Sequence, residues 1–375
     1  MQGARHLTET SRYEQTSLLA VCNGRLQAHL EPIVTTGCRV RTVNGSVGDV
    51  IRAYMETVDY ARNERPDIVF TNAPSWHASF ARRFASHADS LTVLAIRGDL
   101  WAEFDRMLSR RYRGNPGRRL DVHMRRGLAN RNIEGVDHLV AVSEYIRGLI
   151  LERTDVPEER TSTVLPAIDT ERFTPTEAEP AELRAQLGVE VPHLVCAVSN
   201  FGFHDKIEGL SRFMPALHEL LRRRDDVAVA VAGAGTYFEE FQQTHARELA
   251  HERMRMLGYF KPITDLYHAS DLFVHFTLLD GIPNTAAEAN ACGLPVVAND
   301  FPSMFECIDD GVNGLIVPSE LDIDETVGAI ERLLDNPGLR KQMGAAGREL
   351  VVSTRRPEVI GQKLMDILVP LAGVR

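Results

Sequence analysis

Short runs of β-branched and apolar residues alternate along the chain with longer segments of helical period. Residues 193–198 and 227–232 are almost wholly apolar, which is typical of strands buried on both faces of a parallel sheet. This alternation predicts parallel sheets covered by helices on both faces. The predicted strands are residues 17–22, 67–71, 91–96, 137–142, 193–198, 227–232, 271–276, 294–298 and 314–317, and the predicted helices include 48–64, 143–153 and 209–224.

A stretch rich in Pro and Glu, residues 170–190, interrupts this alternation near the middle of the chain. It predicts a boundary between two α/β halves, residues 1–170 and 171–354. The tail, residues 355–375, has the pattern of one last amphipathic helix. We therefore expect an α/β fold of two doubly wound parallel-sheet domains that face a cleft, with ligands bound at the carboxyl ends of the strands.

The composition is that of an ordinary globular protein, with 375 residues, 44% hydrophobic and 25% charged. No apolar run approaches the roughly 18 residues that cross a bilayer, and residues 1–16 are polar without a signal-peptide core. The five cysteines form no CxxC pair, and their odd number favours a reducing compartment. We expect a cytoplasmic protein.

The basic residues are unusual in kind and in distribution. The chain has 38 Arg and only 4 Lys, and its net charge is −10. Nine of the Arg lie between residues 106 and 131, where Asp121 is the only acidic residue. A nucleic-acid-binding protein is usually basic over a broad face, so this pattern predicts no nucleic-acid partner. It indicates a local anionic partner for the first half of the chain.

The segment 277–318 carries the clearest candidate chemistry. Residues 280–283 predict a tight turn, Asn284 can cap a short helix, and Gly293 can close that helix. The backbone N–H groups at such a helix start can bind an anion. Glu288, one turn into the helix, can accept hydrogen bonds from a diol such as ribose, and Asp280 can face the same ligand from the loop. The alternative interpretation is that Asp280 is a simple turn residue and that Glu288 is a solvated helix residue.

The order and spacing of these residues closely resemble the nucleotide-binding core of the retaining glycosyltransferases of family 4 (glycosyl transferases group 1), which have the GT-B fold. That family carries a Glu-x7-Glu motif. The resemblance implies that Glu288 binds the donor ribose and that Asp280, in place of the first Glu, meets the donor sugar. It implies catalytic roles for Asp280, Lys206 and Glu288, and donor contacts at Lys206, Gly233, Gly235, Gly258, Tyr259, Phe260, Gly281, Ile282, Pro283, Asn284, Thr285 and Glu288.

Lys206 lies where the family places a lysine on the donor diphosphate. Because the chain otherwise uses Arg, a compact ammonium that reaches a phosphate explains this rare Lys better than a surface role, which remains the alternative. The family usually has an Arg five residues earlier. This chain has Phe201 there, so one of two phosphate cations is missing.

The first half resembles the family less closely, and only Gly24 occupies the expected glycine-rich loop. Arg97 and Asp99 follow a predicted strand at the place where the family often has a histidine near the acceptor. They can hold an acceptor hydroxyl or phosphate, or form an ion pair at the strand end. Trp101 can offer a stacking face for a sugar ring, or it can be a core residue.

The arginine-rich segment, residues 106–131, is interrupted by Gly and Pro at 114–117 and therefore cannot form one helix. One interpretation is a solvated surface segment. The other is an interfacial segment that meets anionic lipid through Arg118, Arg119, Arg125 and Arg126. Family members that work at the membrane surface favour the second interpretation, and we expect peripheral association with the cytoplasmic face.

Signals for a metal or a nucleophile are weak. Asp322 and Asp324 are predicted to be acids at a helix start, and the histidines lack metal-ligand spacing. The family does not generally need a metal, so no metal and no cofactor are expected.

The resemblance implies transfer of a sugar from a UDP- or GDP-linked donor to an acceptor hydroxyl, which can be lipid-linked, with retention of configuration. The expected setting is glycan, glycolipid or cell-surface polysaccharide assembly. Two alternatives remain open: a sugar-nucleotide epimerase of the same fold, and a non-catalytic partner subunit.

Overall fold

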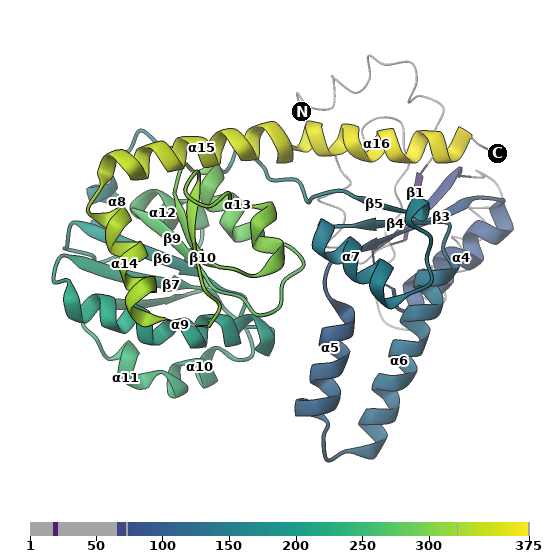
Figure 1. Ribbon diagram of the computed structural model, residues 1–375, viewed down its shortest axis with the longest axis horizontal. Coiled ribbons are helices and arrows are strands. Elements are labelled where there is room, and N and C mark those ends of the chain that lie inside the picture. Colours follow the sequence, from purple (N-terminus) through teal and green to yellow (C-terminus); the bar gives the residue numbers. More distant parts are fainter. Residues whose placement is uncertain (1–17, 22–65, 73, 321, 374–375) are drawn as a thin grey trace. The chain divides into compact units, whose positions relative to one another are not determined.

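The computed structural model describes residues 18–21, 66–72, 74–320 and 322–373 (Figure 1). These residues divide into two compact units. One unit joins the chain up to Ala167 with the segment from Pro357 onward, and the other is Ile168–Arg356. Gly24, Cys22, Cys38 and the predicted helix 48–64 lie outside the described residues.

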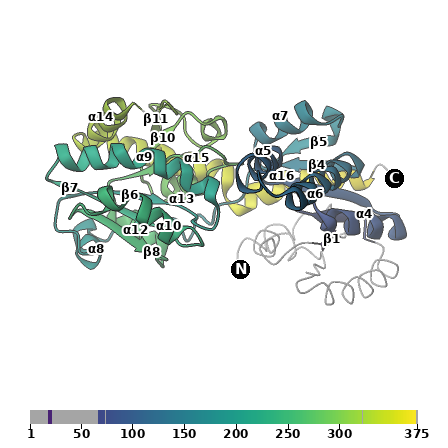
Figure 2. The same cartoon turned by 90° about the horizontal axis from the view of Figure 1, so that it is seen from below.

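The described residues of the first unit include a parallel sheet of five strands in the order β1-β2-β3-β4-β5, and Figure 2 shows β5 and β1 at its opposite ends. The strands are β1 (Leu18–Val21), β2 (Ile68–Thr71), β3 (Leu91–Ile96), β4 (His138–Ala141) and β5 (Thr161–Thr163). The helices are α4 (Trp76–Ala88), α5 (Leu100–Arg106), the π-helical η1 (Met107–Arg111), α6 (Pro116–Gly135), α7 (Glu144–Arg153), the 3-10 turn η2 (Glu158–Arg160) and α16 (Pro357–Gly373).

Alternation along β2 divides the core of this unit between the two faces of the sheet. Ile68 and Phe70 belong to a cluster that includes Leu364 and Leu368 of α16. Val69 points the other way and packs with Phe84 of α4. The predicted last helix is therefore present as α16, and it completes the core of the unit that contains the first strands.

The second unit contains a parallel sheet of six strands in the order β11-β10-β9-β6-β7-β8. The strands are β6 (His193–Val198), β7 (Val227–Ala232), β8 (Met254–Gly258), β9 (Leu272–His275), β10 (Val296–Asn299) and β11 (Gly314–Val317). The helices are α8 (Pro180–Gln186), α9 (His204–Arg223), α10 (Phe238–Thr244), α11 (Ala246–Leu249), α12 (Ile263–Ala269), α13 (Asn284–Ala291), the 3-10 turn η3 (Pro302–Glu306), α14 (Ile323–Leu334) and α15 (Pro337–Arg355). Two parallel sheets with covering helices confirm the predicted α/β class.

The strand order of the second sheet reverses direction between β6 and β9. From β6 the chain proceeds to β7 and β8 on one side, and then crosses to β9, β10 and β11 on the other side. In open parallel sheets, ligands bind outside the carboxyl ends of the strands at such a reversal. The strand order therefore predicts a ligand site at the loops that follow β6 and β9.

Several local predictions can be checked at helix ends. Gly293 follows α13 with a φ of 80°, and Asp322 caps α14 by accepting a hydrogen bond from the Glu325 N–H, so both signals are confirmed. The prediction that Asn284 caps α13 is wrong, because Pro283 is the N-cap and Asn284 is the first helical residue. The predicted break in the arginine-rich segment is confirmed at Asn115, whose side chain caps α6.

Candidate active site

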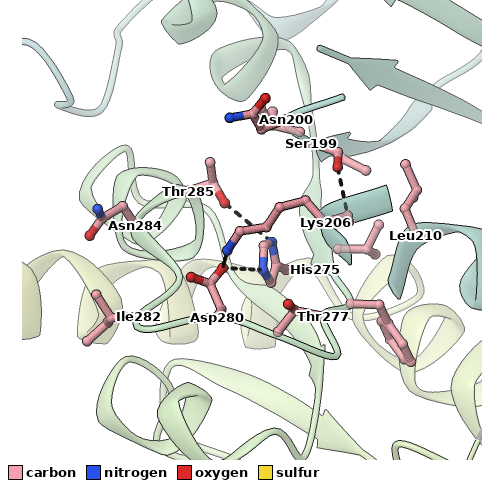
Figure 3. A pocket seen from close by; sticks show the side chains of 14 residues that line it. Ser199, Asn200, Lys206, Leu210, His275, Thr277, Asp280, Ile282, Asn284 and Thr285 are labelled. Atoms are coloured by element: carbon pink, nitrogen blue, oxygen red, sulfur yellow. Dashed lines mark hydrogen bonds and ion pairs between the residues drawn. The ribbon is translucent and has the colours of Figure 1, made fainter. Parts of the chain in front are cut away.

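A pocket of about 200 Å³ opens at the carboxyl ends of β6 and β9, at the reversal in strand order (Figure 3). Its walls come from the loop after β6, the first turns of α9, the end of β9 and the start of α13. Of the side chains that the structure describes, three titratable ones line it: Lys206, His275 and Asp280. The remaining lining residues are Ala197, Val198, Ser199, Asn200, Leu210, Val274, Phe276, Thr277, Ile282, Asn284 and Thr285.

Lys206 and Asp280, two residues predicted for catalysis, meet in this pocket. The Lys206 Nζ atom lies 2.6 Å from the Asp280 Oδ2 atom. The Asp280 side chain is 14% exposed and the Lys206 side chain 33% exposed, so the ammonium group is the more accessible partner. The α9 helix presents the lysine and the loop after β9 presents the aspartate. An ammonium held in this way can turn toward an incoming anion without crossing the pocket.

His275 is a pocket residue to which sequence reasoning gave no role. It ends β9, and its Nδ1 atom lies 3.3 Å from the Thr285 Oγ1 atom. Its Nε2 atom lies 4.0 Å from Asp280 Oδ2. Burial, with the neighbouring Lys206 ammonium, lowers the pKa of His275 to about 4 against the opposing charge of Asp280, so the ring is neutral at pH 7. A histidine that ends an otherwise apolar strand just before the Asp280 loop was the available signal.

The first turn of α13 borders the pocket with Asn284 and Thr285. The first N–H groups of a helix have no partner within it, and no side chain caps this one. The buried Arg355 donates a hydrogen bond to the Asn284 Oδ1 atom at 2.5 Å, and a second, at 3.4 Å, to the Cys307 Sγ atom. Arg355 therefore anchors the start of α13 from the side away from solvent, a role that no sequence motif predicted.

Glu288 lies one turn further along α13 and does not line the pocket itself. Its Oε2 atom accepts a hydrogen bond from the Tyr267 hydroxyl at 3.2 Å. Burial raises the pKa of Glu288 to about 7, although the Tyr267 hydrogen bond and the charges of Arg172 and Arg355 oppose the shift. Further hydrogen bonds, for example from the hydroxyls of a diol, would stabilise the charged form of this half-buried carboxyl.

The raised pKa of Glu288 makes stability depend on pH. Its ordinary value is 4.5, so between about pH 4.5 and 7 the folded state binds more protons than the unfolded state. The free energy of unfolding should therefore fall as the pH rises through this window. We expect Glu288→Gln to remove this loss of stability and to stabilise the protein by about 3 kcal/mol at pH 8, with little effect at pH 4.5. Urea unfolding at the two pH values measures it, with the exposed Glu349→Gln as control. Equal effects at both pH values would contradict the prediction.

Two glycines hold the loop after β7 against the loop after β6. A Cβ atom on Gly233, whose φ is 146°, would lie 1.9 Å from the Ser199 carbonyl oxygen. A Cβ atom on Gly235, whose φ is 152°, would lie 2.1 Å from the Gly202 N atom. Neither position can accept another residue without moving backbone, so the Gly-x-Gly spacing reflects a close approach of two loops.

Phe201, which stands where a second phosphate cation was expected, is fully buried. Its ring packs edge-on against Phe238 and Phe241, with centroids 5.1 Å away in each case. The loop after β6 is thus anchored by an aromatic core residue at this position. Among the residues that line the pocket, Lys206 is the only cation.

The segment predicted to lie against a nucleotide base, Gly258 to Phe260, begins at the last residue of β8. Gly258 has a φ of 63°, and its carbonyl accepts a hydrogen bond from the Gly233 N–H at 2.8 Å. Tyr259 is 77% exposed. The glycine loop after β7 and the end of β8 are therefore joined, and an aromatic side chain stands open to solvent beside them.

The predicted acceptor residues of the first unit occupy different environments. Arg97 is exposed and lines a mainly apolar pocket of about 100 Å³ between the sheet and α16. Asp99 caps α5 through the Ala102 N–H at 2.9 Å, so it has a structural role. Trp101 is 1% exposed and donates a hydrogen bond to Asn130. The predicted stacking face at Trp101 is therefore wrong, because the indole ring lies inside the unit.

The arginine-rich segment forms a helical hairpin of α5 with η1 and α6, which extends away from the sheet of the first unit (Figure 1). Arg119 donates to the Leu108 carbonyl at 2.7 Å, and Arg126 contacts Asp105 at 2.7 Å, so these two cations join the arms of the hairpin. Arg118 lies over the Tyr112 ring, and Arg125 pairs with Asp121.

The outer face of α6 carries an apolar stripe. Leu120 and Met124 are each 61% exposed, and Leu128 is 36% exposed. Their spacing of four residues places them on one face of the helix. Large apolar side chains in a contiguous exposed row usually mark a surface that another partner covers.

No group of three or more His, Cys, Asp or Glu side chains among the described residues is arranged to hold a metal ion. No described helix combines the length and the hydropathy that a membrane span requires.

Comparison with protein families covers both halves of the chain. Residues 181–350 match the family model of the glycosyl transferases group 1, and residues 7–172 match that of glycosyltransferase family 4. A Mycobacterium tuberculosis protein named GDP-mannose-dependent alpha-(1-6)-phosphatidylinositol monomannoside mannosyltransferase is 27% identical over 340 residues, 81% of this chain and 82% of the relative. The lipopolysaccharide core biosynthesis mannosyltransferase LpsB of Rhizobium meliloti is 29% identical over 242 residues, 63% of this chain and 65% of the relative.

Solved structures show the same fold. HepE of Anabaena, in complex with UDP, superposes with a TM-score of 0.71 at 18% identity, over 94% of this chain and 99% of HepE. Sucrose-phosphate synthase of Thermosynechococcus elongatus superposes with a TM-score of 0.76 at 14% identity, over 96% of this chain and 100% of that protein. The fold, the two family matches and the named relatives agree with one another. The chain belongs to the group 1 glycosyltransferases and is a glycosyltransferase of the GT-B type.

Proposed function

We propose that this enzyme moves a sugar from a UDP- or GDP-linked donor to an acceptor hydroxyl with retention of anomeric configuration. The observation that carries the proposal is the meeting of Lys206, Asp280 and the start of α13 in one pocket at the reversal of strand order. The name of the mycobacterial relative specifies GDP-mannose, and the Anabaena neighbour was solved with UDP. These names support a nucleotide-diphosphate donor and leave both bases open.

The pocket suits the diphosphate of such a donor. Lys206 supplies a compact cation, and the start of α13 supplies N–H groups at the positive end of the helix dipole. Both stabilise the negative charge that develops on the leaving group, which lowers the barrier without a covalent step by the protein. The acceptor hydroxyl attacks on the face from which the diphosphate departs, and the departing phosphate takes its proton.

The other donor contacts follow from the same placement. Glu288 would accept hydrogen bonds from the two ribose hydroxyls, which its poorly satisfied carboxyl favours. The backbone of residues 258–260 would lie along the base, beside the Gly233 and Gly235 loop. Asp280 would hold the donor sugar once the diphosphate has taken Lys206. In this proposal residues 171–354 bind the donor and residues 1–170 bind the acceptor, with Arg97 on the acceptor side.

A coupled assay tests the reaction. Purified protein is incubated with single UDP- and GDP-sugars and a lipid extract, and released nucleotide and glycosylated product are both measured. Release that depends on extract, with an α-linked product from an α-linked donor, supports the proposal. Binding of a donor without transfer to any acceptor would favour the non-catalytic partner subunit, and absence of binding would refute the donor site.

We infer further that the acceptor is a lipid-linked hydroxyl and that the enzyme works in the cytoplasm at an anionic membrane surface. The buried free cysteines 196, 292 and 307 agree with a reducing compartment. The apolar stripe lies on α6 together with Arg118 and Arg125, which are both exposed, although Arg125 pairs with Asp121. Apolar side chains and exposed cations on one helix suit insertion among anionic headgroups. Arg119 and Arg126 join the two arms of the hairpin and are less exposed, so we assign the docking face to the apolar stripe with Arg118 and Arg125.

Replacing Leu120, Met124 and Leu128 with serine should abolish flotation of the protein with vesicles of anionic lipid. Burial of these side chains supplies the apolar part of the binding, and cations alone bind weakly at physiological salt. Flotation with anionic and with zwitterionic vesicles measures the effect. Phe305 and Val312, which are also exposed, provide the matched serine control in the second unit. Unchanged flotation of the α6 variant would refute this docking face.

A further inference from the structure

His275, which lines the pocket, has a ring nitrogen without a hydrogen-bond partner among the described residues. Its side chain is 13% exposed, and its Nε2 atom is buried without a hydrogen-bond partner among the described residues. A buried polar atom without a partner costs free energy, so its retention requires a reason. The Asp280 Oδ2 atom lies 4.0 Å from Nε2, which is just beyond hydrogen-bond distance (Figure 3).

The same carboxylate oxygen has a closer neighbour. The Lys206 ammonium group lies 2.6 Å from Asp280 Oδ2, so this one oxygen atom has both Lys206 and His275 as neighbours. The groups that face the ring are Lys206 from α9, Asp280 from the loop after β9 and the Thr285 hydroxyl from α13. Because Lys206 is the more exposed partner of the ion pair, an anionic ligand can compete with Asp280 for the ammonium group. When the ion pair breaks, His275 remains as a neighbour of the Asp280 carboxylate.

We propose that His275 is a positioning residue that holds Asp280 in place when the donor diphosphate draws Lys206 away. The inference rests on the proposed donor site. The Nδ1 atom lies 3.3 Å from the Thr285 hydroxyl, and we assign the donor role to that hydroxyl, which places the proton of the neutral ring on Nε2, toward Asp280. A movement of about 1 Å then makes the Nε2–H to Oδ2 hydrogen bond. Without it, a short carboxylate that has lost its counter-ion would swing freely beneath the donor sugar.

The electrostatics of the site agree with this exchange. The pKa of His275 is lowered by burial and by Lys206, and it is raised by Asp280. In the free enzyme the ring is therefore neutral and able to donate one hydrogen bond. When the ammonium turns to a dianionic ligand, its effect on the ring is cancelled, and the pKa of His275 rises. The ring thus senses whether the diphosphate is bound.

Two substitutions separate hydrogen bonding from packing. His275→Phe keeps a flat ring and removes both nitrogens, and His275→Gln keeps an amide N–H near the place of Nε2. We expect His275→Phe to lower kcat by about tenfold with a donor KM within about threefold, because Lys206 and α13 still bind the diphosphate. His275→Gln should retain most of kcat. His218→Gln is the control, since His218 also has an unsatisfied ring nitrogen but lies outside the pocket.

Nitrogen-15 NMR of labelled histidines gives a readout that packing alone does not move. In the free enzyme His275 should show a proton on Nε2 at pH 7, and addition of UDP or GDP without sugar should shift that resonance and raise its pKa. The inference is overturned if nucleotide binds and the resonance does not respond. It is also overturned if His275→Phe has wild-type kcat, or if the Gln and Phe variants lose kcat equally.

The failure of the proposed function would look different. Wild-type protein that neither binds nor turns over any UDP- or GDP-sugar refutes the donor site, whatever the His275 variants do. Wild-type turnover with an indifferent His275→Phe variant refutes only the positioning role. Urea midpoints of all variants exclude loss of folded protein as the cause.

Discussion

Replacing Lys206 with alanine is expected to lower kcat/KM for the nucleotide-sugar donor by about two to three orders of magnitude. Among the described residues, Lys206 is the only cation that lines the pocket, and Phe201 occupies the core position where a second one was expected. No neighbouring lining side chain can therefore take over the charge of the leaving diphosphate. Initial rates over a range of donor concentration measure the effect, with the exposed Lys341→Ala as control.

A second variant distinguishes a role of Lys206 in stabilising the diphosphate from a role as counter-ion of Asp280. Lys206→Ala leaves Asp280, only 14% exposed, without its ion-pair partner, and an unpaired carboxylate can itself disturb the pocket. The double variant Lys206→Ala with Asp280→Asn removes both charges. If Lys206 serves the diphosphate, the double variant stays as slow as the single one. Recovery of the rate in the double variant would refute this role and leave Lys206 as a counter-ion for Asp280.

Replacing Gly344 with alanine is expected to destabilise the second unit by about 2 to 3 kcal/mol. Gly344 lies in α15, and a Cβ atom there would stand 1.9 Å from the Gly293 carbonyl oxygen at the end of α13. Backbone has to move, so α15 and α13 must separate. The gain in helix propensity, roughly 1 kcal/mol, does not offset this cost. Because α13 carries Thr285 and Glu288, donor affinity should fall together with the urea midpoint.

Gly328 in α14 offers the matched control. It is also a helical glycine of the second unit, but a Cβ atom there would have nothing within 4 Å. Gly328→Ala should therefore stabilise the protein by about 0.5 to 1 kcal/mol, the difference in propensity alone. Opposite signs for the two substitutions support a backbone clash at Gly344. A neutral or stabilising Gly344→Ala would contradict the close packing of α15 on α13.

Hydrophobic periodicity predicted most of the described strands, and the two that it missed have physical reasons. The three residues of β5 are Thr, Ser and Thr, which provide no apolar run. β8 lies at the sheet edge and mixes Arg255 with two methionines, so it lacks the pattern of a buried strand. Neighbouring strands supply the hydrogen bonds that fix both elements, and such long-range pairing is invisible in a local window.

In the candidate site, residues within one motif were easier to predict than contacts between elements. The spacing from Asp280 to Glu288 and the rarity of Lys206 are visible in the sequence, and the structure brings Lys206 to Asp280. The partners that set the properties of the site lie far away in the chain. Tyr267 contacts Glu288 from α12, and Arg355 anchors Asn284 from α15. No local pattern connects these residues, because burial and tertiary packing create their interactions.

The membership of α16 in the first unit affects how the enzyme can be divided into fragments. Leu364, Met365 and Leu368 pack on the same sheet face as Ile68 and Phe70, although the rest of that unit ends at Ala167. The second unit, Ile168–Arg356, is one uninterrupted stretch of chain. A fragment that stops at Ala167 would expose an apolar sheet face to water and would be prone to aggregate. Separate production of the first unit therefore requires a fragment in which a linker joins Ala167 to residues 357–373 in place of the second unit.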